Sequence, residues 1–299
     1  SLEQQIDSAP RALIGLRKQP SPTVIYTRGN IRDPAESVQP AGLSAIKQLP
    51  AEFADSVSIS DGRRRRKLAD WITDARNPLF ARVIVNRLWH YHFGTGLVDT
   101  PSDFGLNGGR PSHPELLDWL AATFVAEGYS LKRMHRRILM SEAWRQSALF
   151  NEQADKVDAD NRWLWRFRPY RLDAETVRDA MLLASGELNP QLGGPSFQPF
   201  TTTFFNTTFY HLFDKGTPEF NRRTIYRMHV NTGRDPLLDS LDCPAPSVLT
   251  PRRRQTITPL QALGLMNDTI VLRQSSKLAG RISGHSNSQD KQIHEAWQR

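Results

Sequence analysis

The segment from Asn77 to Leu120 constrains the fold of this chain more than any other, because it places two strong helix signals around a long glycine-rich connection. Apolar side chains recur at helical spacing in its first part: Phe80, Val83, Ile84, Leu88 and Tyr91. They predict an amphipathic helix over residues 78–92, with Pro78 in its first turn. Ser112 and Glu115 then predict a capping box that opens the next helix.

The connection between these helices, residues 94–111, is predicted to be a shaped functional loop that lines the main cleft. Ordering so long a loop costs conformational entropy, which contacts or a bound ligand must offset. Asp103 in the loop and His113 at the following helix start are the candidate catalytic pair, because a proton-transferring histidine works beside a carboxylate. The alternative is structural: Asp103 bonds nearby backbone amides, and both residues act as caps.

Two arginines near helices are candidate ligand-binding residues. Arg87 falls on the apolar side of the first predicted helix, where an arginine either extends its charged end to water, forms an ion pair, or binds an anion. Arg171 stands just before another helix, whose predicted N-cap is Asp173. Carboxylates at this helix start could serve general acid–base catalysis only as a pair held in unlike environments. Sequence spacing alone does not show such a pair.

A second arginine group precedes the last strongly predicted helix. Arg252, Arg253 and Arg254 stand just before Thr258 and Gln261, which predict a capping box. Their charges and the helix dipole would together attract an anion, so we treat all three as candidate ligand-binding residues. A structural clamp on the C-terminus of a neighbouring helix is the alternative use of such arginines.

The charge balance favours an anionic partner. Lys and Arg exceed Asp and Glu by 39 − 31 = 8, and the sequence pI is near 9.9. A positive excess attracts polyanions, and arginine binds sulfate, phosphate or carboxylate with two parallel hydrogen bonds. Ordinary surface charge is the alternative. Nucleic acid is not favoured, because the chain has no recognisable nucleic-acid-binding module, and the basic run at 63–67 leads directly into a solvated helix.

Several classes of protein and site are not indicated by the sequence. It contains no run of about 18 apolar residues, so no membrane span is predicted. Cys243 is the only cysteine, which excludes an internal disulfide and a thiolate metal cluster. The chain also lacks a C-x-x-C-H haem attachment pattern. We therefore predict no metal site and no cofactor in this chain.

The expected fold class is mainly α: an irregular multi-helix domain with at least six helices, a small β element and long ordered loops. The β element is assigned to residues 23–30 and 197–230, where FQPFTTTFFNTTFY and RRTIYRMHV are predicted strands. Residues 1–60 are rich in proline and serine, and we expect an extended arm that packs on a main domain of residues 61–299.

Consecutive helices joined by short connections pack as neighbours, so we expect one core to hold Trp89, Trp119, Phe124 and Ile138. His135 lies on the same helical face as Ile138 and is expected to be a core histidine with one bonded nitrogen.

Four separated strings carry a family resemblance: NPLFARVIVNRLWHYHFGTGLVDTPSDFG, PSHPELLDWLA, GYSLKRMHRRILMSEAWRQS and RRRQTITPLQALGLMND. In this order they resemble the planctomycete-type domain of unknown function found at the C-terminal end of large proteins with cytochrome-c-like domains. The resemblance implies a periplasmic, secreted or cell-surface protein, with haem c carried by upstream modules. It also implies a frequent setting of sulfated-polysaccharide breakdown, and a chain that is a fragment of a longer one. It supplies no established reaction.

Two functions remain open on this basis. The first is a module that binds an anionic polymer, such as a sulfated polysaccharide, beside a haem-carrying partner domain. The second is a hydrolase or lyase acting on such a polysaccharide, with Asp103, His113, Arg87 and Arg171 converging at one cleft.

Overall fold

The computed structural model describes residues 21–53, 60–284 and 288–298. These residues form eleven α-helices and two two-stranded antiparallel sheets, so the predicted mainly helical fold is confirmed. None of the described helices is both long and apolar enough to cross a membrane. The chain divides into two compact units, Ser1–Arg168 and Pro169–Arg299. The predicted arm over residues 1–60 stays a prediction, because part of it lies outside the described residues.

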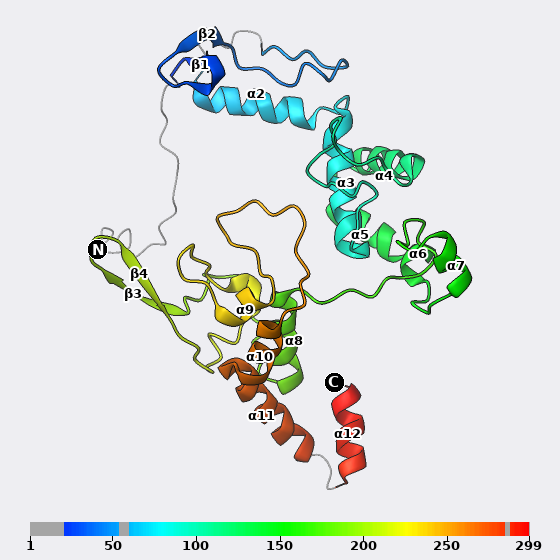
Figure 1. Cartoon of the computed structure of the whole chain (residues 1–299), viewed down its shortest axis with the longest axis vertical. Helices are drawn as coiled ribbons and strands as arrows, with labels where there is room; N and C mark the ends of the chain where they lie inside the picture. The colour runs from blue at the N-terminus through cyan, green and yellow to red at the C-terminus, as the bar shows by residue number, and fades with distance from the viewer. Residues whose placement is uncertain (1–20, 54–59, 285–287, 299) are drawn as a thin grey trace. The chain divides into compact units, whose positions relative to one another are not determined.

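The first unit begins with a strand pair and continues as helices (Figure 1). Its elements are β1 (Thr23–Tyr26), η1 (Thr27–Gly29), β2 (Pro34–Val38), α2 (Asp61–Thr73), α3 (Pro78–Phe93), α4 (Pro114–Ala126), α5 (Leu131–Leu139), α6 (Glu142–Arg145) and α7 (Glu152–Val157). β1 and β2 are antiparallel, with Thr23 opposite Val38. α3 packs against both α4 and α5, and it begins where the apolar spacing predicts.

The core of the first unit lies among α3, α4 and α5. Trp89, Phe124 and Ile138 are buried in one cluster there, as predicted. The prediction that Trp119 joins them is wrong: its side chain is 52% exposed, and the Arg137 guanidinium lies 5.4 Å from the centre of its ring. The reason is helical periodicity, which turns this position of α4 away from the face that packs on α3.

The loop at residues 94–111 is held by a buried amide of α3. The Nδ2 atom of Asn86 donates to the Val98 carbonyl at 2.9 Å, and the Val98 amide donates to Oδ1 of Asn86 at 2.8 Å. Asn86 is completely buried. A Cβ on Gly96 would lie 2.7 Å from Oδ1 of Asn86, so this position requires glycine. The loop is therefore a fixed structure attached to the core.

The predicted capping box at Ser112 and Glu115 is wrong. α4 begins at Pro114 with His113 as its N-cap, and no side chain caps it. The backbone amide of Ser112 instead donates to the Leu97 carbonyl at 2.8 Å, and its hydroxyl lies 3.3 Å from the same oxygen. The serine is used to close the loop, so it is not free to cap the helix.

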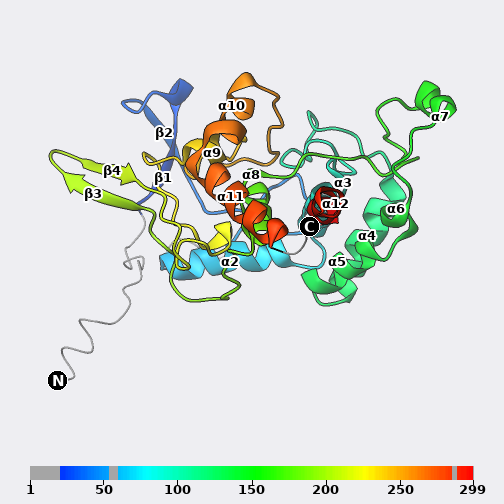
Figure 2. The same ribbon diagram turned by 90° about the horizontal axis from the view of Figure 1, so that it is seen from below.

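The second unit packs four helices together, as Figures 1 and 2 show. Its elements are α8 (Ala174–Ser185), β3 (Phe200–Phe204), β4 (Thr208–Leu212), η3 (Thr224–Tyr226), α9 (Pro236–Ser240), α10 (Pro259–Asn267), α11 (Thr269–Ser283) and α12 (Gln289–Gln298). α8 contacts α9 and α11, and α10 contacts α9 and α11. The capping box predicted at Thr258 and Gln261 is confirmed at the start of α10.

The core of the second unit is smaller. Its buried apolar members are Ala174, Leu237, Leu238, Leu241 and Ile270, from α8, α9 and α11 with the residue after α9. Each unit therefore has a separate hydrophobic cluster of its own.

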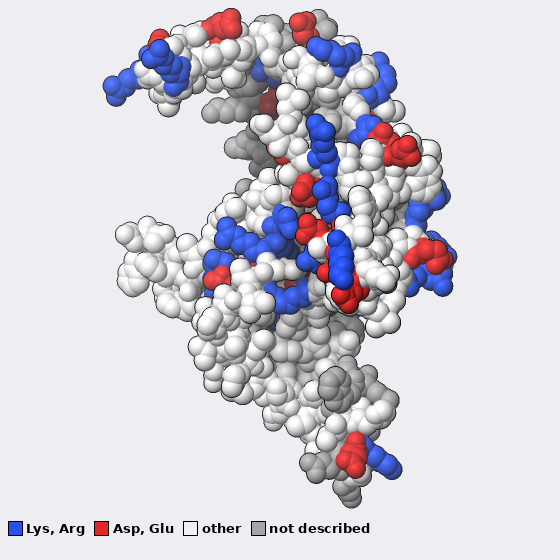
Figure 3. All heavy atoms as spheres, turned by 45° about the vertical axis from the view of Figure 1, so that its right-hand side comes forward, with Lys and Arg blue, Asp and Glu red and all other residues white. Residues whose placement is uncertain are grey.

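The β element of the second unit is a single hairpin, β3–β4, with Phe200 opposite Leu212. It contains no Lys, Arg, Asp or Glu, and it is the white projection on the left of Figure 3. The second strand predicted over residues 222–230 is wrong: the segment forms η3 and isolated bridges. The cause is Thr224, whose amide and hydroxyl both donate to Oδ1 of Asp179, at 2.7 and 2.6 Å, instead of to a strand ladder.

Candidate functional site

Asp103 and His113 lie in the predicted loop and at the start of α4, but each has a local partner. Oδ1 of Asp103 accepts from the Gly105 amide at 2.9 Å, which closes a tight turn. Nδ1 of His113 lies 3.0 Å from the Ser112 hydroxyl. Within the described part of the chain, no hydrogen bond or ion pair joins Asp103 to His113. Their catalytic role stays a prediction.

Arg87 is half-buried on α3, beneath the same loop. One guanidinium nitrogen, Nη2, donates to the Ser102 hydroxyl at 3.2 Å. Its Nε atom is buried and has no hydrogen-bond partner among the described residues. The contact with Ser102 attaches the loop to α3, which is a structural use of the arginine. Its ligand-binding role stays a prediction.

Arg171 belongs to the second unit and joins three segments of it. Its guanidinium donates to Oδ2 of Asp242 at 2.6 Å, to Oε1 of Gln261 at 3.0 Å and to the Thr256 carbonyl. Burial opposes ionisation of Asp242, but hydrogen bonds from Thr256 and Arg171 hold the pKa of this carboxyl below its ordinary value. The arginine that sequence reasoning assigned to a ligand thus makes three hydrogen bonds within the protein, and the assignment stays a prediction.

The three arginines before α10 differ in their surroundings. Arg253 makes two hydrogen bonds to the Glu175 carboxylate, at 2.5 and 2.9 Å. Despite burial, this contact holds the pKa of Glu175 below its ordinary value. Arg252 and Arg254 are exposed and have no hydrogen bond or ion pair in the described ranges. Arg253 is therefore held by a carboxylate in the first turn of α8, not at a helix C-terminus as the alternative expects, while Arg252 and Arg254 are free to meet an anion.

Cys243 lies next to this ion pair and is not a reactive thiol. Its Sγ atom is 3.7 Å from Oε1 of Glu175. Burial, together with the nearby Glu175 charge, raises the pKa of Cys243 to about 11. At neutral pH the sulfur is therefore protonated, and the thiolate that nucleophilic catalysis requires is scarce.

A pocket of about 70 Å³ in the first unit brings together three arginines that sequence reasoning did not single out. Arg110 comes from the end of the 94–111 loop, and Arg162 and Arg168 come from the segment after α7. All three side chains are exposed, and none has a hydrogen bond or ion pair with another described residue. The remaining residues that line the pocket are Trp89, Phe93, Thr95, Gly96, Leu97, Asp99, Ser112, Asp160, Asn161 and Leu164.

Local hydrogen bonds fix the segment that carries Arg162. The two carboxylate oxygens of Asp158 accept from the backbone amides of Arg162 and Trp163, at 2.9 and 2.8 Å. Asn161 is buried with a left-handed backbone, and its side chain bonds the amide and the carbonyl of Arg166. The turn therefore presents the arginines from a rigid backbone. The sequence signal for it is the run RWLWRF, whose aromatic residues draw attention before its arginines do.

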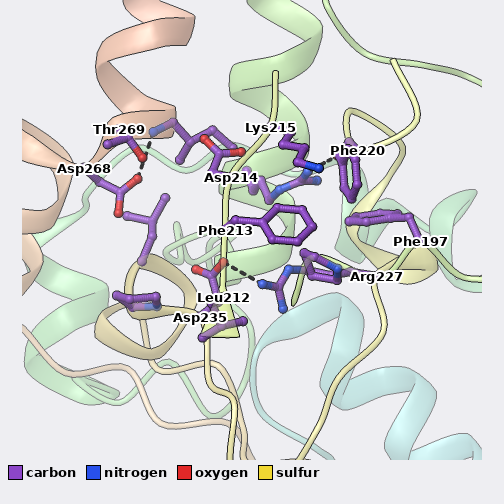
Figure 4. Close-up of a pocket in the computed structure, with 15 residues that line it drawn as sticks. Phe197, Leu212, Phe213, Asp214, Lys215, Phe220, Arg227, Asp235, Asp268 and Thr269 are labelled. Carbon is purple, nitrogen blue, oxygen red and sulfur yellow. Dashed lines mark hydrogen bonds and ion pairs between the residues drawn. The ribbon is translucent and has the colours of Figure 1, made fainter. Parts of the chain in front are cut away.

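A second cavity, of about 190 Å³, lies in the second unit and is shown in Figure 4. Arg227 is buried at its wall and pairs with Oδ2 of Asp235 at 2.9 Å. The Lys215 amine lies 4.5 Å from the centre of the Phe213 ring. Burial, and then the neighbouring Asp235 and Asp214 charges, raise the pKa of Asp268 against a hydrogen bond from the Ile270 amide. Cationic, anionic and aromatic groups thus line one cavity.

Comparison with known families gives one match. A family model described as PSD1, a protein of unknown function (DUF1553), matches residues 64–299. No curated protein matches the chain, and no solved structure matches it. The matched range contains both the arginine pocket and the cavity of the second unit. It confirms the resemblance carried by the four sequence strings, and the chain belongs to the PSD1 (DUF1553) family, a planctomycete-type domain of unknown function.

Proposed function

We propose that this protein is an extracytoplasmic module, periplasmic or at the cell surface, that binds an anionic polymer such as a sulfated polysaccharide. The observation that carries the proposal is the pocket lined by Arg110, Arg162 and Arg168, whose guanidinium groups have no anionic partner among the described residues. The family resemblance supports the extracytoplasmic location. It also supports a haem-carrying cytochrome-c-like domain of the same full-length protein as the neighbouring domain.

The chemistry of the pocket matches a sulfate or carboxylate group. A guanidinium offers two parallel N–H groups to a planar or tetrahedral anion, and such charge-assisted bonds are the stronger kind. Asp99 and Asp160 also line the pocket, but neither forms an ion pair with the three arginines. The pocket is small enough to hold one anionic substituent while the polymer continues over the surface.

An exposed aromatic residue neighbours one of the pocket arginines in the sequence. Trp163 follows Arg162 directly, and its side chain is 63% exposed. An indole face at the protein surface is suited to pack against a sugar ring. The pairing of an exposed tryptophan with unpaired arginines supports a sugar that carries negative charge over a simple inorganic anion.

The alternative function, a hydrolase or lyase acting on the same polymer, has Asp103 and His113 as its candidate pair. General acid–base catalysis requires these groups to work at one reacting centre. In the part of the chain that is described, each is bonded to its own neighbour and neither to the other. Binding is therefore the function that the geometry supports best.

The test replaces Arg110, Arg162 and Arg168 together by Gln and measures the salt concentration that elutes the protein from a dextran sulfate column. We expect the variant to elute at clearly lower salt than the parent, because each lost arginine removes a direct contact with sulfate. Neither protein should be retained on uncharged dextran.

The matched control replaces three exposed cations of α5, Lys132, Arg133 and Arg136, by Gln. These side chains line none of the described cavities and have no ion pair there, so the net charge changes by the same three units. We expect a smaller shift than for the pocket variant. Equal shifts for the two triple variants would show that retention follows total charge, and the proposed site would be rejected.

A further inference from the structure

The cavity of the second unit differs from the arginine pocket in volume, composition and location in the chain. Its wall is built from α8, β4 and the residues after it, α9, and the start of α11. At about 190 Å³ it is smaller than the cavities that hold drug-sized molecules, so it suits a single small ring. Nothing in the proposed polymer binding uses this cavity.

Most charged groups around the cavity are already satisfied by the protein. Asp214 is paired with Arg273 through both carboxylate oxygens. Asp235 accepts from the Leu238 amide at 3.0 Å with one oxygen and from Arg227 with the other. Every oxygen of these two carboxylates therefore has a partner within the protein, so their role in the cavity wall is structural.

Arg227 has unused donors although it is almost completely buried. Its side chain is 4% exposed, and only Nη2 has a partner, the Asp235 carboxylate. Nε and Nη1 have no hydrogen bond with any described residue. Both nitrogens can therefore donate to an acceptor group of a ligand in the cavity. The Arg227 guanidinium and the Lys215 amine both line the cavity, and Lys215 has no carboxylate partner in the described ranges.

The opposite side of the cavity offers a free acceptor. Asp268 is the N-cap of α11, and its Oδ1 atom accepts from the Ile270 amide at 3.0 Å. Its second oxygen, Oδ2, has no hydrogen-bond partner among the residues that the structure describes. Figure 4 shows Phe213 between Asp268 on one side and Arg227 on the other.

The wall between these polar ends is aromatic. Phe213 and Phe220 lie edge to face with their ring centres 5.4 Å apart, and Phe197 meets Phe220 in the same manner at 6.0 Å. A ligand must therefore bring an apolar face for the rings, an anionic group for Arg227 and Lys215, and a hydroxyl donor for Asp268. A sugar acid has all three on one ring.

We propose that this cavity is a ligand site that binds a small sugar acid, with its carboxylate against Arg227 and Lys215, its ring on Phe213 and a hydroxyl donating to Asp268. The site recognises one monosaccharide unit and is separate from the polymer-binding pocket. It belongs to the second unit alone, so its occupation does not require the arginines of the first.

The experiment titrates the full chain with D-glucuronate in a calorimeter. Two comparison compounds each lack one recognised feature: D-glucose has no carboxylate, and cyclohexanecarboxylate has no hydroxyl groups. We expect glucuronate to bind. We expect each comparison compound to bind about ten-fold or more weakly than glucuronate, because each compound leaves a polar group of the cavity without its partner. Absence of heat with glucuronate at millimolar concentration would overturn the proposal.

Two variants assign the contacts without removing a core residue. Lys215→Gln removes the exposed ammonium group. Asp268→Asn keeps a good N-cap for α11 but replaces the free acceptor oxygen by a donor. We expect each to weaken glucuronate binding by about ten-fold. The control is Lys291→Gln, an exposed lysine of α12 that does not line the cavity.

Each remaining outcome decides the proposal. The proposal is supported if Lys215→Gln and Asp268→Asn weaken glucuronate binding and Lys291→Gln does not. Equal weakening by all three variants would show unspecific attraction by charge, and unchanged affinity in both cavity variants would show binding elsewhere. Equal affinity for glucuronate and cyclohexanecarboxylate would show that no hydroxyl is recognised, and the assignment to a sugar acid would fail.

Discussion

At the scale of single residues, the pair formed by His92 and His135 joins α3 to α5. Nε2 of His92 lies 2.8 Å from Nδ1 of His135, and the edge of the Trp144 indole packs against the His92 ring. The sequence predicts His135 as a core histidine with one bonded nitrogen; the structure places one nitrogen in this bond, but the residue is half-buried at the edge of the core. Burial, and then the neighbouring His135, lower the pKa of His92. Only one proton can lie between the two nitrogens, so the bond is lost when both rings are charged.

This pair predicts a loss of stability in mild acid. The pKa of His92 is lowered in the folded protein from the ordinary value of 6.5, so the unfolded chain binds a proton first as the pH falls. Its contribution to the free energy of unfolding is complete above pH 6.5 and declines below it. Urea denaturation of the parent at several values between pH 5 and pH 8 should show this decline.

The variant His92→Gln keeps a neutral hydrogen-bonding group but cannot titrate. We expect its stability to vary less with pH than that of the parent. His211→Gln, a change on the exposed β3–β4 hairpin, is the control and should leave the parent's pH dependence unaltered. Parallel curves for the parent and His92→Gln would exclude the histidine pair as the cause.

At the scale of elements, the loop at residues 94–111 depends on α3 more than on its own sequence. Asn86 satisfies both backbone groups of Val98, and Arg87 bonds Ser102. The glycines of this loop allow the close approaches that its path requires, as at Gly109, where a Cβ would lie 1.9 Å from Oδ1 of Asp99. The arginine pocket has this loop as one wall, so its shape depends on the same attachment.

We therefore predict that Asn86→Leu destabilises the protein by about 2–4 kcal/mol, because it leaves the buried amide and carbonyl of Val98 without partners at about 1–3 kcal/mol each. Denaturant unfolding measures the loss, and amide hydrogen exchange should show faster exchange at Val98. The same variant should also elute earlier from dextran sulfate.

Asn267→Leu is the control, since Asn267 is an exposed residue of α10 that bonds only the Leu263 carbonyl of its own helix. Its unfolding free energy should change by less than about 0.5 kcal/mol. Unchanged stability of Asn86→Leu would mean that the loop does not need this amide.

At the scale of the whole molecule, the net charge of +8 overstates the charge that is free to meet a ligand. In the second unit Arg171, Arg178, Arg227 and Arg253 are each bonded to carboxylates or carbonyls of the protein. The exposed arginines of the pocket in the first unit have no such partners. Polyanion binding that depends on total charge and binding that depends on direct arginine contacts should therefore respond differently to salt.

We predict that salt separates these two contributions to polyanion binding. At low ionic strength, the pocket variant and the α5 control variant should both bind dextran sulfate more weakly than the parent, because long-range attraction depends on total charge. Above about 0.15 M salt the Debye length is only about 8 Å. The control should then match the parent in an equilibrium binding assay, while the pocket variant stays weaker. Convergence of all three proteins at this ionic strength would contradict a specific arginine contact.

The sequence by itself determined the helical character, the starts of α3 and α10, and the family. Helix α3 follows from apolar spacing, and the cap of α10 from Thr258 and Gln261, because a helix closes its hydrogen bonds within four residues and its signals are local. Local signals failed where a distant group competed: Ser112 closes a loop instead of capping α4, and Thr224 bonds Asp179 instead of a strand.

Only the tertiary structure decided which arginines are free and which lie together. Arg110 and Arg162 are far apart in the chain, and their meeting at one pocket depends on how α3 and the segment after α7 pack. Sequence reasoning selected Arg171 and Arg253, which the fold bonds internally, and passed over Arg110, Arg162 and Arg168. The physical reason is that an arginine's charge is available to a ligand only when no carboxylate or carbonyl of the folded chain lies within its reach, and that distance is set by packing between residues that the sequence does not place side by side.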